Sequence, residues 1–255
     1  MAAMASDASA AAATAAARAV PGGAGARLAV IVGGGIVGAS TAYFLGREAR
    51  EAGWRVILLE RHAIGAAASG KAGGFIAADG WGDGITDELH REGFALHEEL
   101  ASELGVRSYR KLPTKSVSQT GGKPGRNTQA DSAGSQGPAL LNAATTRASQ
   151  MDDHTAQVTP QELCDRLVEA AKASGVEVRM EGAAGLTESG DGNYAVRLDA
   201  GETIAADRVV ITTGPWAVAA EDWLGGRIKV PMVGIASTSL VLQAPAGATV
   251  AAQAC

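Results

Sequence analysis

The sequence predicts an α/β fold built on a parallel sheet, and three observations support this. An apolar run at residues 28–32 leads into a glycine-rich turn at residues 33–38, and a helical pattern follows at once. A second apolar run, residues 55–59, ends at Glu60. Helix and strand patterns alternate again between residues 159 and 216. Strands that alternate with helices are typical of βαβ units.

The glycine turn has the spacing of a dinucleotide-binding turn. Gly33 permits the tight exit from the strand, Gly35 lets a pyrophosphate approach the backbone, and Gly38 lets the helix pack near the strand. Free N–H groups at the helix start and the helix dipole favour an anion. Ile36, Val37 and Tyr43 are expected to face the sheet. The candidate cofactor-binding residues of this turn are Gly33, Gly34, Gly35, Ile36, Val37 and Gly38.

Glu60 follows the second strand, about 20 residues after the turn, where a carboxylate accepts hydrogen bonds from a ribose. A glutamate here argues against a 2′-phosphate, and so against NADP. The alternative interpretation is an ordinary α/β turn with chance glycines. The strand, turn, helix and carboxylate in this order favour a Rossmann-like dinucleotide site.

A second loop, residues 61–77, comes directly after Glu60 and is rich in small residues. Small side chains let a large planar or phosphorylated ligand lie against backbone N–H groups. An NAD site does not need this second contact, whereas an extended flavin dinucleotide does. The alternative is a plain flexible loop. An amphipathic helix is predicted at residues 87–104, and its histidines are interpreted as surface or packing residues rather than metal ligands.

The second half of the chain contains a helix, several strands and a glycine turn. Thr159 and Glu162 predict a capping box at the start of a helix. Strands are predicted at residues 176–180, 194–198 and 203–205, and a buried strand at residues 207–213 ends at a glycine turn. Trp216, after that turn, is predicted to lie in the core. The free Cys164 is predicted to pack in the core.

Composition excludes several classes of function. The chain has 255 residues, 46% of them hydrophobic, and a formal net charge of −5, so nucleic acid is not expected as a partner. No apolar run is long enough to predict a membrane span. We expect a soluble intracellular protein, in the cytoplasm or, if residues 1–27 are a transit peptide, in a plastid or mitochondrion. Otherwise residues 1–27 are a disordered extension.

Taken in their order along the chain, these motifs resemble those of the FAD-dependent oxidoreductases of the D-amino-acid oxidase, glycine oxidase and sarcosine oxidase (DAO) superfamily. The chain is most similar to a poorly characterised eukaryotic branch. The loop at residues 68–74 (ASGKAGG) is similar to the family's second flavin-contact loop, and residues 209–216 (VVITTGPW) to its strand and turn beneath the flavin. The likeness spans roughly residues 28–112 and 152–243.

The resemblance implies a role for each candidate residue. The turn glycines would hold the FAD pyrophosphate, and Glu60 the adenosine ribose, with Arg61 beside it. Ala184 would meet the adenine, while Thr213 and Gly214 would close the site. The residues implied along the path from phosphate to isoalloxazine are Ser69, Lys71, Ala72, Gly73 and Gly74.

The resemblance also implies chemistry and domain boundaries. It implies oxidation of a C–N bond of an amino acid or secondary amine by hydride transfer to flavin, with dioxygen as electron acceptor; it names no catalytic residue. Residues 28–112 and 152–230 would form the FAD-binding domain, 113–151 a low-complexity loop, and 231–255 the start of a truncated α+β substrate domain. The alternatives are a flavin-binding protein without turnover, or an NAD-dependent Rossmann enzyme.

Overall fold

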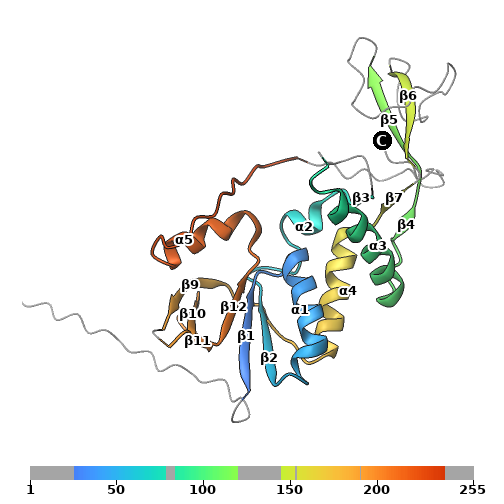
Figure 1. Cartoon of the computed structure of the whole chain (residues 1–255). Helices are drawn as coiled ribbons and strands as arrows, with labels where there is room; N and C mark the ends of the chain where they lie inside the picture. Colours follow the sequence, from blue (N-terminus) through green and yellow to red (C-terminus); the bar gives the residue numbers. More distant parts are fainter. Residues whose placement is uncertain (1–25, 79–83, 120–144, 153, 190, 239–255) are drawn as a thin grey trace, which may run out of the picture.

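A computed structural model describes residues 26–78, 84–119, 145–152, 154–189 and 191–238. Its centre is a parallel four-stranded sheet in the order β12-β1-β2-β8, with two helices packed on one face (Figure 1). This arrangement confirms the predicted α/β class. The sheet and its helices are β1 (Arg27–Val32), β2 (Trp54–Leu59), β8 (Glu177–Arg179), β12 (Arg208–Ile211), α1 (Ile36–Ala49) and α4 (Pro160–Ala173).

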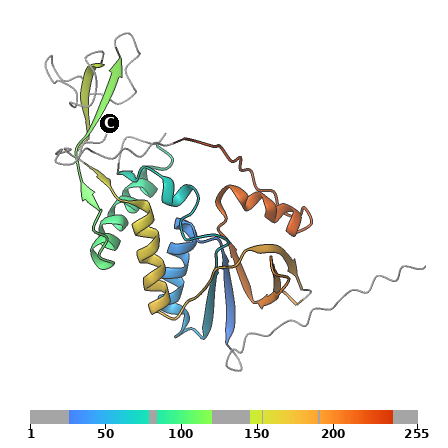
Figure 2. The ribbon, with the colours of Figure 1, turned by 180° about the vertical axis from the view of Figure 1, so that it is seen from behind.

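The sheet is buried on both faces because successive side chains of a strand point to opposite sides. Ile31 and Leu58 pack against α1 and α4, whereas Val30 and Ile57 pack against an antiparallel meander; all four are 0% exposed. Figure 2 shows the meander on the side of the sheet opposite the helices. Its strands are β9 (Ala183–Glu188), β10 (Tyr194–Leu198) and β11 (Thr203–Ala206).

A second antiparallel sheet, ordered β3-β7-β4, lies at the far side of the helices, beside α3. From it the strands β5 and β6 pair antiparallel and extend away from the body. The sequence predicts a low-complexity loop at residues 113–151. This prediction is wrong at the two ends of the range, which form β5 and β6; residues 120–144 lie outside the described part. These elements are β3 (Phe75–Ala77), α3 (Asp87–Glu103), β4 (Arg110–Lys111), β5 (Thr114–Gln119), β6 (Thr145–Asp152) and β7 (Thr155–Gln157).

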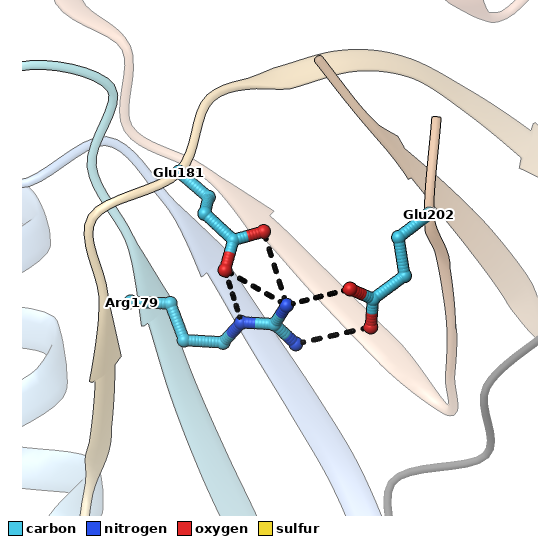
Figure 3. A network of polar contacts seen from close by, with 3 residues as sticks. All are labelled: Arg179, Glu181 and Glu202. Atoms are coloured by element: carbon cyan, nitrogen blue, oxygen red, sulfur yellow. Dashed lines mark hydrogen bonds and ion pairs between the residues drawn. The ribbon is translucent and has the colours of Figure 1, made fainter. Parts of the chain in front are cut away.

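An ion-pair network joins the meander to the parallel sheet (Figure 3). The Arg179 guanidinium donates to Glu181 at 2.9 Å and to Glu202 at 3.0 Å. Burial opposes the charge of Arg179, but the two carboxylates raise its pKa above the ordinary value. The Arg179 side chain is only 14% exposed, so these bonds stabilise the meander more than a surface pair would.

Several local predictions are wrong because tertiary contacts decide them. Thr159 makes no side-chain cap, and Glu162 instead accepts hydrogen bonds from the Arg107 and Ser108 amides. Val37 does not face the sheet and is 61% exposed. Trp216 is not in the core and is 63% exposed, because the chain turns outward into a 3-10 helix, η1 (Gly214–Val218), followed by α5 (Ala219–Trp223).

The predicted strand at residues 207–213 is shorter than expected and only half-buried, since β12 lies at the sheet edge. Cys164 is fully buried, as predicted, and burial raises the pKa of its thiol to about 11. Most of the N-terminal extension (residues 1–25) and of the final segment (239–255) lies outside the described residues. In the part described, none of the helices has the length and apolarity needed to cross a membrane.

Gly38 is expected to tolerate no side chain. A Cβ there would overlap the Gly33 carbonyl oxygen and lie 2.7 Å from the Thr212 hydroxyl. We expect Gly38→Ala to lower the free energy of unfolding by about 1–3 kcal/mol, because overpacking separates α1 from β1. Gly93 in α3 is the matched control, since a Cβ there meets nothing within 4 Å. Gly93→Ala should stabilise the protein by up to about 1 kcal/mol. Urea unfolding measures both; equal effects would contradict the packing described.

Glu162 makes stability depend on pH. Hydrogen bonds from Ser108 and from the Arg107 amide lower the pKa of this carboxyl. A group whose pKa is lower when folded stabilises the protein above its unfolded pKa and loses that contribution as pH falls through the folded value. We therefore expect wild type to lose stability in acid faster than Glu162→Gln, between about pH 5 and 3. Thermal unfolding across that range measures it; parallel curves for the two proteins would refute it.

Candidate cofactor site

The glycine turn brings three backbone segments into contact at the carboxyl end of β1. The Gly33 amide donates to the Leu59 carbonyl at 2.8 Å. Gly33 has φ +108°, and a Cβ there would lie 2.7 Å from the Thr212 carbonyl oxygen. Only glycine combines this conformation with so close an approach. The turn can therefore pack against the ends of β2 and β12 with no side chain of its own between them.

Two side chains from other loops reach the start of α1. The Gly34 amide donates to Glu60 Oε2 at 2.7 Å, and the Ile36 amide donates to Ser69 Oγ at 2.9 Å. The next amides, of Val37 and Gly38, belong to the first turn, where a helix offers no internal acceptor. A helix start of this kind favours a negatively charged ligand.

Glu60 lies directly after β2 and its carboxylate bridges two backbone segments. One oxygen accepts the Gly34 amide at 2.7 Å, and the other accepts the His62 amide at 2.8 Å. Each carboxylate oxygen can accept a further hydrogen bond. Glu60 is half-buried, so the remaining acceptor positions are available to a polar ligand beside the turn.

Arg61 connects this edge of the site to the meander. Its guanidinium donates to the Ala183 carbonyl at 2.8 Å and forms an ion pair with Asp199 at 3.1 Å. Ala184 follows at a β-bulge: Ala183 pairs with Leu198 and the residue after Ala184 pairs with Arg197, which leaves Ala184 with no opposite residue in the described ladder. The Arg61 guanidinium thus lies next to the strand segment that contains Ala184.

The second small-residue loop is held in place rather than free. The Val158 amide donates to the Gly74 carbonyl at 2.9 Å, and the Gln157 side chain donates to the Gly73 carbonyl at 3.2 Å. A Cβ on Gly74 would overlap the Val158 carbonyl oxygen. Lys71 and Ala72 lie on the exposed rim of this loop, at the end of the one-turn helix α2 (Ala68–Lys71).

The end of β12 closes the turn from the opposite side. Thr212 donates its hydroxyl to the Val32 and Gly33 carbonyls, each at 2.9 Å. The next hydroxyl, of Thr213, is buried without a hydrogen-bond partner among the described residues. Gly214 is exposed, with φ +55°. Thr212 was not among the predicted site residues, because only the fold shows that its hydroxyl meets the glycine turn.

These residues fit a bound dinucleotide. The turn offers amide donors to an anion, the Glu60 carboxylate offers acceptors to hydroxyl groups, and the Thr213 hydroxyl has unused hydrogen-bonding capacity. The turn is closely lined, since a Cβ on Gly35 would lie 2.9 Å from Ser69 Oγ. Within the described ranges, no group of three histidine, cysteine or acidic residues could hold a metal ion.

Two yeast proteins are among the curated relatives of this chain. "Putative oxidoreductase C1F5.03c" of Schizosaccharomyces pombe is 41% identical over 93 residues, which are 34% of this chain and 24% of that protein. "Putative oxidoreductase TDA3" of Saccharomyces cerevisiae is 37% identical over 93 residues, 34% of this chain and 17% of that protein. This chain therefore matches a quarter or less of each.

Solved structures share the fold over a longer stretch. Glycine oxidase from Geobacillus kaustophilus has a TM-score of 0.63 at 22% identity, covering 76% of this chain and 57% of its own. L-amino acid deaminase from Proteus myxofaciens, in complex with anthranilate, also has a TM-score of 0.63 at 22% identity; the match covers 84% of this chain and 50% of the deaminase chain. This chain thus spans roughly half the length of these structures.

The match to a protein family is the broadest of these findings. The family of FAD-dependent oxidoreductases matches residues 29–254, and so includes the glycine turn, Glu60, the small-residue loop and the end of β12. Together with the Rossmann-like sheet and its meander, this match shows that the chain belongs to the FAD-dependent oxidoreductase (DAO) family.

Proposed function

We propose that this chain forms the FAD-binding part of an enzyme that oxidises a C–N bond of an amino acid or secondary amine. The proposal rests on one observation. Three features meet at one edge of the sheet: the backbone amides at the start of α1, the Glu60 carboxylate and the small-residue loop, which is held by hydrogen bonds. When bound, FAD would supply the redox step, accepting a hydride from the carbon beside nitrogen and passing the electrons to dioxygen.

The residues of this chain would bind and orient the cofactor. The glycine turn would hold the pyrophosphate through its amides, with Ser69 beside the Ile36 amide. Glu60 would accept hydrogen bonds from the adenosine ribose, and Ala184 and Arg61 would line the adenine side. Hydrogen bonds to a charged acceptor such as Glu60 contribute about 1.5–3 kcal/mol each.

The path toward the flavin ring would follow the small-residue loop. Lys71 places a positive charge on the exposed rim, where it would attract the phosphates. Ala72, Gly73 and Gly74 would let the flavin lie against the backbone, since none of them carries a side chain larger than a methyl group. Thr213 and Gly214 would close the site from β12, with the unpaired Thr213 hydroxyl available to the ligand.

The substrate class rests on the names of structural relatives, which include a glycine oxidase and an L-amino acid deaminase. Both names support an amino acid or related amine as substrate. The name glycine oxidase also supports dioxygen as the electron acceptor.

A visible spectrum of the purified chain tests the cofactor. We expect absorption bands of oxidised flavin, either as purified or after addition of FAD, and peroxide release with at least one member of an amino-acid and amine panel. Bound flavin without peroxide would instead support a flavin-binding protein without turnover. A colourless protein that binds NAD and ignores FAD would contradict the proposal.

Glu60→Gln tests the ribose contact. The variant is neutral and its amide nitrogen cannot accept a hydrogen bond, so FAD affinity should fall by about 2 kcal/mol. Glu177→Gln is the matched control, because Glu177 lies on the same sheet but contacts Arg55 instead. Its FAD affinity should equal that of wild type. Calorimetric titration measures both; an unchanged affinity in Glu60→Gln would remove this residue from the site.

A further inference from the structure

The loop at residues 64–74, here called the flavin-contact loop, rests directly on the glycine turn. The Gly65 amide donates to the Gly34 carbonyl at 3.0 Å. Four residues later the Ser69 hydroxyl accepts the Ile36 amide at 2.9 Å. The Gly70 amide then closes the loop on itself, donating to the Gly65 carbonyl at 2.8 Å. The position of Ser69 at the helix start therefore depends on the position of the whole loop.

Beside Gly65 and Gly70 the loop is also held by the side chain of Gln161, in the first turn of α4. Its amide nitrogen donates to the Ile64 carbonyl at 2.8 Å. A Cβ on Gly65 would lie 2.7 Å from its amide oxygen, and a Cβ on Gly70 would overlap that oxygen. The Gln161 amide thus occupies the space left by two glycines of the loop.

The geometry of Gln161 is itself fixed. Its nitrogen also donates to Asp165 Oδ1 at 2.9 Å, one helical turn further along α4. The helix beneath is anchored in the core by Leu163 and Leu167, which are 4% and 0% exposed. A half-buried polar side chain with two hydrogen bonds loses little further freedom when the loop packs on it, so it can hold the loop in one conformation.

We propose that Gln161 is a positioning residue for the cofactor, acting through the flavin-contact loop. Its hydrogen bonds go to Ile64 and Asp165 rather than to the glycine turn or Glu60; it would act by keeping Ser69 at the Ile36 amide and by setting the path of the loop toward Gly74. The inference rests on the proposed function, because it assumes that FAD lies along this loop.

The test compares Gln161→Met with Lys172→Met in the full 255-residue chain. Methionine is close to glutamine in size but cannot donate to the Ile64 carbonyl. Lys172 is exposed near the end of the same helix, far from the loop, so its variant controls for the new side chain. We expect Gln161→Met to weaken FAD binding about three- to tenfold. Affinity for AMP, which lacks the flavin half, should stay within about twofold, and so should both affinities of Lys172→Met.

Two further readouts separate positioning from a general loss of stability. Hydrogen exchange of the Gly65 and Gly70 amides should accelerate in Gln161→Met without ligand, and the visible spectrum of bound FAD should shift. Gln161→Asn, one methylene too short to reach Ile64, should behave in the same way.

The proposal is overturned if FAD affinity and amide exchange match wild type, or if FAD and AMP affinities fall together with the melting temperature. If the wild-type chain itself does not bind FAD, the result contradicts the proposed function and not the role of Gln161 specifically.

Discussion

The structure depends on a close approach of three backbone segments at the start of α1. β1 ends at Gly33, α1 passes over it at Gly38, and β12 reaches the same point through Thr212, whose hydroxyl bonds the Val32 and Gly33 carbonyls. A side chain at either glycine would separate these segments. Because neither glycine carries a side chain, β1, α1 and the end of β12 meet closely, and the Val37 and Gly38 amides lie in the first helical turn, where the helix offers no internal acceptor.

The other residues at this edge of the sheet either contribute polar groups to the start of α1 or hold the loops that contain those groups. Glu60 arrives from the end of β2, and its own amide donates to the Arg179 carbonyl at 3.0 Å, beside the ion pairs that hold the meander. Ser69 arrives from a loop that Gln161 supports from the opposite side. The ligand-binding groups thus lie on loops, while a parallel sheet and two core-anchored helices fix where those loops meet.

The sequence could predict the α/β class, the glycine turn and Glu60, because these signals are local: an apolar run, a glycine spacing and a carboxylate at a set distance. It could not predict Thr212 or Gln161, whose contacts join segments far apart in the chain. The same limit explains two errors. Glu162 has the spacing of a capping residue but accepts hydrogen bonds from a distant loop. Trp216 has a large apolar side chain of the kind usually found in a core, but it follows an edge strand and is exposed.

In the proposed function, the glycine turn and Glu60 bind the ADP half of FAD. An amide chemical-shift titration of the chain with FAD tests it most directly, because it reports on each backbone N–H separately. If FAD binds here, the largest shifts fall on residues 33–38, with smaller ones at the neighbouring Glu60 and Ser69. Shifts confined to another part of the molecule, with those amides unmoved at saturating FAD, would contradict it.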